Sequence, residues 1–217
     1  MLKNKCMTVV IILFVSSLFI YRTIVQRSFA ELIIFLFSIA IHELGHILVA
    51  YALGDKPKIN LAFLGFSLNT EKDFHSVNGV LIYLAGPIAN LIFGVLIFLY
   101  SMYEYIPKSN FFIFYNALLF SINLIPAYPL DASRVIYSIL YNRFGKIKSV
   151  KIVCTISYII GFSILFIGLY IFLVLQNNFL LVMLGCLILT STKKEFEYAY
   201  YFELKTINNS ISRTIDR

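Results

Sequence analysis

Two histidines and a glutamate lie close together in residues 39–49, a stretch that is otherwise apolar. The motif reads His42-Glu43-x-x-His46. Residues four apart share one face of an α-helix, so the imidazoles of His42 and His46 can hold one metal ion between them. The H-E-x-x-H spacing is typical of zinc sites in which the glutamate acts as general base. We therefore predict that His42 and His46 bind zinc and that Glu43 accepts a proton from a metal-bound water.

The alternative interpretation is a pair of buried helix histidines that only pack against neighbouring helices. Composition favours the functional interpretation, because the 217 residues are 60% hydrophobic and only 13% charged, with a mean hydropathy of +0.85. A soluble domain carries about 25% charged residues. The chain is therefore an integral membrane protein, and ionisable residues inside a membrane-spanning helix are costly and usually functional.

The elements that position the motif are hydrophobic segments, and we predict an all-α polytopic membrane protein with about six transmembrane helices. The segments are 7–25, 29–53, 77–103, 110–140, 149–175 and 178–192, and together they form one domain over residues 1–192, followed by a short cytoplasmic tail at 193–217. We interpret the first segment as an uncleaved span, since no small-residue cleavage site follows it.

The net charge of +7 orients the protein and does not indicate nucleic-acid binding. Of the 18 lysines and arginines, all but Arg22, Arg27 and Lys108 fall in loops on one side of the predicted spans. The positive-inside rule then places both termini in the cytoplasm. The three cysteines are far apart without a CxxC spacing, so neither a disulfide framework nor a thiolate metal site is predicted.

Residues 58–69, between the second and third segments, alternate partly between apolar and polar side chains. This pattern predicts a short β-hairpin that turns near Leu64-Gly65, with an amphipathic surface loop as the alternative. In the third segment Gly86, Asn90 and Gly94 recur every four residues, which favours close approach by another helix. Asn90 additionally needs partners, since a buried amide without hydrogen bonds is costly.

The fourth segment carries a second group of polar residues, Asn123, Asp131 and Arg134, around Pro126 and Pro129. Prolines interrupt a helix, and irregular backbone at membrane depth is tolerated only inside protein or beside a water-filled cavity. Asp131 can reach a depth similar to that of His46 and would serve as a third zinc ligand, leaving the fourth position to water. An ion pair between Asp131 and Arg134 is the alternative.

These motifs together resemble the site-2 protease family of zinc intramembrane metalloproteases. The residues that carry the resemblance are His42-Glu43-x-x-His46, Ala85-Gly86-Pro87-x-x-Asn90 and Asn123-x-x-Pro126-x-x-Pro129-Leu130-Asp131. The resemblance covers about residues 1–192, and the compact layout is most similar to the stage IV sporulation protein FB group.

The resemblance implies one Zn²⁺ per chain, bound by His42, His46 and Asp131, with Glu43 as the catalytic carboxylate. It implies a re-entrant hairpin at 58–69 that borders the substrate path. It implies that Asn123 and Pro129 position the substrate, and we predict the same role for Asn90.

The substrate implied by the resemblance is a membrane-associated pro-protein, cleaved at or near the cytoplasmic side of the bilayer, such as a pro-sigma factor in sporulation. Small membrane proteins that inhibit or activate the enzyme are the implied regulatory partners. Two departures are visible: Ala132 replaces the usual glycine after the ligand aspartate, and no nucleotide-sensing domain follows residue 192, so nucleotide regulation through such a domain is not expected.

Two rival functions remain at this point. An ion- or proton-coupled transporter could use the His/Glu/Asp cluster, but the spans show no inverted repeat and a general base is not needed for transport. A different membrane zinc protease would more often take its third ligand from a glutamate, and no glutamate follows Glu43 inside a later span.

Overall fold

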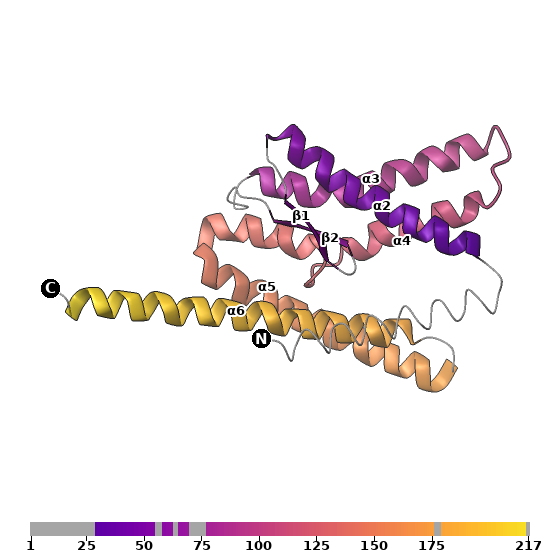
Figure 1. Ribbon diagram of the computed structural model, residues 1–217. Coiled ribbons are helices and arrows are strands. Elements are labelled where there is room, and N and C mark those ends of the chain that lie inside the picture. The colour runs from indigo at the N-terminus through magenta and orange to yellow at the C-terminus, as the bar shows by residue number, and fades with distance from the viewer. Residues whose placement is uncertain (1–28, 55–57, 63–64, 70–76, 176–178, 216–217) are drawn as a thin grey trace. The chain divides into compact units, whose positions relative to one another are not determined.

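The computed structural model describes residues 29–54, 58–62, 65–69, 77–175 and 179–215 (Figure 1). The elements in chain order are α2 (Phe29–Ala52), β1 (Lys58–Ala62), β2 (Gly65–Asn69), α3 (Val77–Ser101), α4 (Ser109–Asn123), α5 (Asp131–Leu175) and α6 (Leu180–Ile215). Helices dominate the described part of the chain, as predicted. The expected span at 7–25 lies outside the described residues.

Three of the described helices are long and apolar enough to cross a membrane: Phe29–Ala52, Asn78–Ser101 and Asp131–Val174. Their outward sides carry large apolar side chains, including Leu36, Ile92 and Phe166, which are 55%, 54% and 68% exposed. Such surfaces are stable in lipid and unfavourable in water. The structure therefore supports a membrane protein, while the total of six spans stays a prediction.

The described residues form two compact units, one from the described parts of 29–69 with 85–121 and the other from those of 77–84 with 122–215. In the first unit, α2 packs closely against α3. A Cβ at Gly45 would lie 2.6 Å from the carbonyl oxygen of Ala85 and 2.7 Å from the Cβ of Ala89, so only glycine permits this approach. The predicted small-residue stripe on α3 thus lies in a helix–helix contact.

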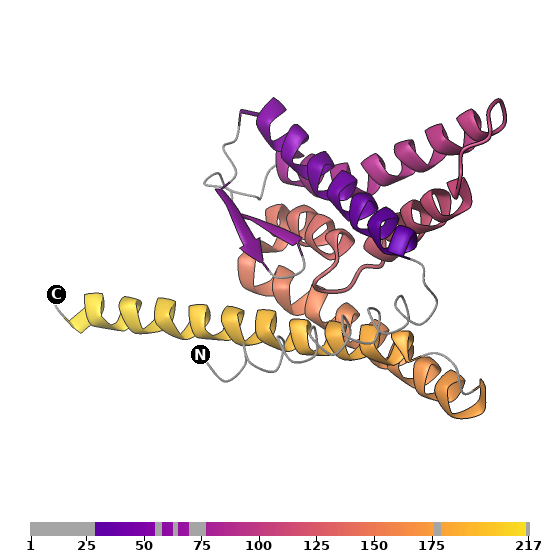
Figure 2. The ribbon, with the colours of Figure 1, turned by 45° about the vertical axis from the view of Figure 1, so that its right-hand side comes forward.

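Two short strands in the same unit pair antiparallel, with Lys58 opposite Asn69 and Ala62 opposite Gly65. Strand β2 lies beside α2 (Figure 2). The strands fall within the stretch for which the sequence predicted a hairpin. Its re-entrant position in a membrane stays a prediction.

In the second unit, α5 and α6 lie along each other. Their buried contact includes Val150, Val153 and Cys154 of α5 and Ala199 of α6. Glycine again permits close approach, because a Cβ at Gly185 of α6 would lie 2.9 Å from the backbone of α5.

The predicted fourth segment at 110–140 is not one continuous helix. Helix α4 ends at Asn123 and α5 begins at Asp131, with turns in between. Pro126 and Pro129 lack the N–H groups that a continuous helix needs, which accounts for the break. The freed backbone finds other partners: the Tyr128 N–H donates to Ser157 Oγ at 3.0 Å.

Helix α5 covers the end of the predicted fourth segment and all of the fifth, and it is interrupted at Gly145, where φ is 74° and ψ is 174°. Figure 1 shows the ribbon of α5 turning back on itself. This conformation is essentially restricted to glycine, so Gly145 divides α5 into two helical parts.

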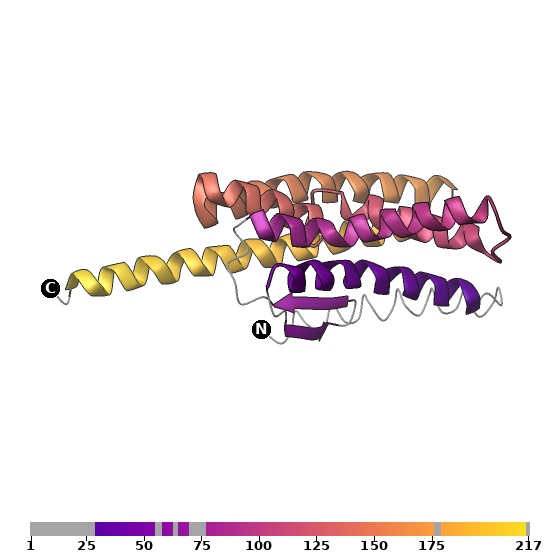
Figure 3. The same ribbon diagram turned by 90° about the horizontal axis from the view of Figure 1, so that it is seen from above.

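Helix α6 does not end at residue 192, where the sequence analysis placed the start of a short tail. It continues to Ile215 (Figure 3). No glycine or proline occurs after Gly185, and Lys and Glu are good helix formers. Lys193 and Glu197 form an i,i+4 ion pair at 4.0 Å, and Ala199 is buried against α5. The cytoplasmic location of this segment stays a prediction.

Candidate metal centre

Both histidines of the motif lie on the buried face of α2. His42 is 7% exposed and His46 is 5% exposed. Ser38, one turn before His42, and Gly45 are buried on the same face. The helical spacing therefore places both imidazoles where the sequence predicted, in the interior of the protein.

The two imidazoles are arranged as ligands of one ion would be. Nε2 of His42 lies 3.2 Å from Nε2 of His46, and the ring planes are 86° apart. Zn–N bonds of about 2.0–2.1 Å at a tetrahedral angle separate two ligand nitrogens by about 3.3–3.4 Å. The observed separation fits zinc between the two rings.

Helix α3 lies directly against these rings at Gly86. A Cβ there would overlap Nε2 of His46 and would lie 2.6 Å from Cε1 of His46 and 2.9 Å from Cε1 of His42. Any side chain at residue 86 would therefore displace a ligand. The glycine was predicted as part of a packing stripe, but its contact with the ligands was not.

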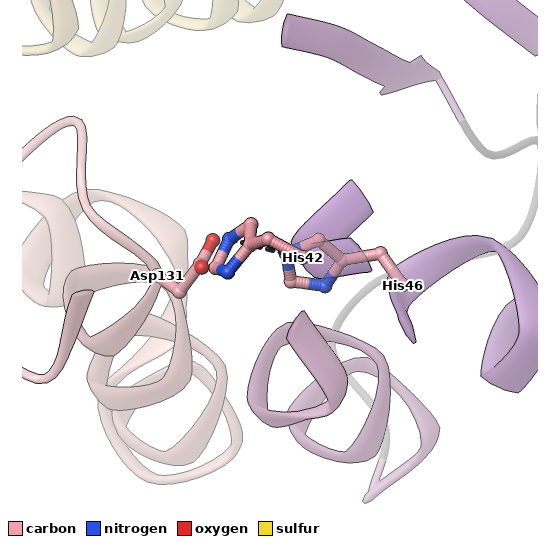
Figure 4. A group of neighbouring side chains, drawn as sticks. All are labelled: His42, His46 and Asp131. Carbon is pink, nitrogen blue, oxygen red and sulfur yellow. Dashed lines mark hydrogen bonds between the residues drawn. The ribbon is translucent and has the colours of Figure 1, made fainter. Parts of the chain in front are cut away.

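Asp131 supplies the carboxylate of the group. It is the first residue of α5 and is 9% exposed. One ligand atom from each of His42, His46 and Asp131 lies within 4.8 Å of the others (Figure 4). A negative charge is stabilised in the first turn of a helix, and Ser133 fixes this turn by donating from Oγ to the Leu130 carbonyl at 2.6 Å.

Glu43 follows His42 on α2 and is half-buried. Among the described residues, the group able to hold a metal consists of His42, His46 and Asp131, without Glu43. This leaves Glu43 beside the ligands and suits it to a proton-transfer role. Two imidazoles and a carboxylate are a ligand set of catalytic zinc sites, in which the fourth position takes water.

The alternative interpretation, an ion pair between Asp131 and Arg134, stays open. The Arg134 guanidinium carbon lies 5.5 Å from the centre of the Tyr83 ring, a cation–π contact. This contact does not exclude an additional ion pair with Asp131.

The remaining predicted site residues differ in their surroundings. Asn90 on α3 is completely buried. Asn123 ends α4 and is half-buried, and Pro129 is exposed in the turn before α5. Substrate positioning by these three residues stays a prediction.

Sequence reasoning missed Ser38 and Asn116, both of which are completely buried. Asn116 Nδ2 donates to Ser38 Oγ at 3.0 Å. Asn116 could have been identified from the sequence as an asparagine inside an apolar segment, because a buried amide must be hydrogen-bonded.

Fold and ligand set together define a class, a helical membrane protein with a buried site of two histidines and one aspartate. No protein-family model matches the chain. Zinc metalloprotease MJ0392 of Methanocaldococcus jannaschii is 31% identical over 189 residues, which cover 84% of this chain and 53% of that protein. The chain thus spans about half the length of this relative.

A solved structure, the site-2 protease from Methanocaldococcus jannaschii, matches with a TM-score of 0.70 and 29% sequence identity. The match covers 87% of this chain and 88% of that structure. Both similarities support the site-2 protease family, which the three sequence motifs resemble. They do not distinguish the stage IV sporulation protein FB group within it.

Proposed function

We propose that this chain is a zinc-dependent intramembrane endopeptidase that hydrolyses a peptide bond of a membrane-associated protein at or near the cytoplasmic side of the bilayer. The observation that carries the proposal is the buried ligand group, in which the two Nε2 atoms are 3.2 Å apart and Asp131 completes the set. Similarity to a zinc metalloprotease and to a site-2 protease structure supports the same activity.

A bound zinc would supply a water of lowered pKa and polarise the scissile carbonyl. Glu43 would accept a proton from the attacking water and return it to the leaving amine. His42, His46 and Asp131 would hold the metal in a buried position, and Gly86 keeps the histidine rings free of steric overlap. The role of this chain is thus to fix the ligands and to move one proton through Glu43.

The scissile segment of a transmembrane substrate must leave its helix, because helical backbone is hydrogen-bonded and shielded. We place the extended segment along the β1–β2 pair, where an added strand can take up main-chain hydrogen bonds. The position of β2 beside α2, the helix that carries both histidines, supports this assignment.

A narrower proposal concerns the substrate. Resemblance to the stage IV sporulation protein FB group favours a membrane-tethered pro-sigma factor, from which the enzyme would remove the pro-sequence. Small membrane proteins that inhibit or activate cleavage belong to the same proposal.

Co-expression with a candidate membrane-tethered pro-protein tests the function. The unmodified enzyme should produce a shortened product, and Glu43→Gln should abolish it, because an amide of similar size cannot accept the proton. The Glu43→Gln protein should still contain zinc. Glu104→Gln is a matched control, since Glu104 is exposed and accepts a hydrogen bond from Tyr100. A shortened product from Glu43→Gln would refute the proposed mechanism.

The comparisons do not favour the transporter alternative. Two results together would support the transporter: the unmodified protein cleaves none of the tested substrates, and Glu43→Gln changes the ion flux into vesicles that contain the purified protein.

A further inference from the structure

Three buried side-chain atoms on α3 and α4 have no hydrogen-bond partner in the described part of the chain. They are Nδ2 and Oδ1 of Asn90 and Oδ1 of Asn116. Both asparagines are 0% exposed. Leaving such groups unpaired costs about 1–3 kcal/mol each, so native proteins normally satisfy them, often with internal water.

Asn116 already uses its donor group. Its Nδ2 donates to Ser38 Oγ at 3.0 Å and to the Phe112 carbonyl at 2.8 Å. Ser38 Oγ in turn donates to the Ile34 carbonyl at 2.9 Å. Only Oδ1 of Asn116 is left over, and it needs a donor from outside this network.

Asn90 and Asn116 lie on the same side of α3. Asn90 is one turn before Gly94, and a Cβ at Gly94 would lie 3.4 Å from the Cβ of Asn116. One helical turn is about 5.4 Å along the axis. This spacing suits a bridging water, which donates to the Asn116 oxygen and bonds to the Asn90 amide.

The sequence positions of Ser38 on α2 and of Asn90 on α3 place this site near His42 and His46. Ser38 is one turn before His42 on α2, and Asn90 is one turn after Gly86, which contacts both histidine rings. Gly86 has no side chain to separate Asn90 from the imidazoles.

We propose that Asn90 and Asn116 form an internal water-binding site beside the metal centre. Its water satisfies the three orphan atoms. Its role rests on the proposed function: each hydrolysis consumes one water, and a water held one helical turn from the ligands refills the open metal position within an apolar bundle.

The direct test is water-edited solid-state NMR of the unmodified protein in bilayers, with labelled asparagine side chains. Polarisation should pass from water to the amides of Asn90 and Asn116 about as fast as to those of Asn78 and Asn110, which are exposed on the same two helices. Signals are assigned by their loss in Asn90→Ser and Asn116→Ser. Absence of transfer to either buried amide would overturn the proposal. The same result is expected if the two amides bond directly to each other without a water.

The functional role has a separate readout. Asn90→Leu should lower the cleavage rate constant about tenfold while zinc content stays at the unmodified level, whereas Asn78→Leu, the matched control on α3, should leave both unchanged. An unchanged cleavage rate in Asn90→Leu would refute the refilling role. Because the NMR measurement does not depend on activity, failure of the water site and failure of the protease proposal are distinguishable.

Discussion

At the residue scale, the site depends on missing side chains as much as on the ligands. His42 and His46 lie against α3 only because Gly86 has no Cβ, and α3 approaches α2 only because Gly45 has none. Donor chemistry and steric room are therefore both conditions for metal binding.

Gly86→Ala tests the steric condition. The added methyl group would overlap Nε2 of His46, so the imidazole must rotate away and zinc content should fall strongly. Gly94→Ala is the control, because its Cβ would lie 3.4 Å from the nearest atom, an ordinary contact. Metal analysis of the two purified variants gives the comparison. Equal zinc content in both would show that α3 is not as close to the rings as described.

The candidate ligands could be identified from sequence, and their surroundings could not. His42, Glu43 and His46 form a pattern whose spacing is itself the geometry, since one helix positions all three. Asp131 could be added as a candidate ligand only from its predicted depth in the membrane and from the resemblance to the site-2 protease family. The contact of Gly86 with the rings and the bond from Asn116 to Ser38 depend on which helix faces which, and local spacing does not contain that information.

At the element scale, two interruptions position the ends of the helices. Turns between α4 and α5 place Asp131 at a helix start, and Gly145 divides α5. The first interruption was predictable because two prolines mark it. The second depends on one glycine among good helix formers, a weaker signal. The continuation of α6 past residue 192 was missed because a charged segment was read as a tail, although Ala199 packs as a helix residue.

Ser157→Ala tests what holds the turn before Asp131. Ser157 is 0% exposed and accepts the Tyr128 N–H at 3.0 Å, so its loss leaves a buried donor unsatisfied. We expect the free energy of unfolding to fall by about 1–3 kcal/mol. Ser163→Ala is the matched control. Ser163 is an exposed residue of the same helix and, like Ser157, donates to the carbonyl four residues before it. Equal stability of the two variants in thermal unfolding in detergent would exclude a stabilising role for the Tyr128–Ser157 bond.

At the scale of the whole molecule, the ligands come from distant parts of the sequence. His42 and His46 belong to α2 and Asp131 to α5, and both helices are apolar enough to cross a membrane. A ligand that binds only the folded protein stabilises it by mass action. We therefore expect zinc binding and folding to be coupled in this protein.

Removal of the metal should accordingly lower the unfolding temperature. Free zinc at about 1,000 times its dissociation constant stabilises a fold by about 4 kcal/mol, so chelation should shift the thermal transition of the unmodified protein downward. His46→Ala should unfold at the same temperature with and without chelator. A chelator-insensitive transition in the unmodified, zinc-loaded protein would contradict the coupling.

The zinc content of Asp131→Asn tests most directly the claim that His42, His46 and Asp131 hold one zinc ion. The unmodified protein should contain about one equivalent of zinc per chain, and Asp131→Asn should lose most of it while remaining folded. Arg134→Ala, which removes a neighbouring charge that contacts Tyr83, should keep the full equivalent. Full zinc occupancy in a well-folded Asp131→Asn protein would contradict the assignment of the third ligand.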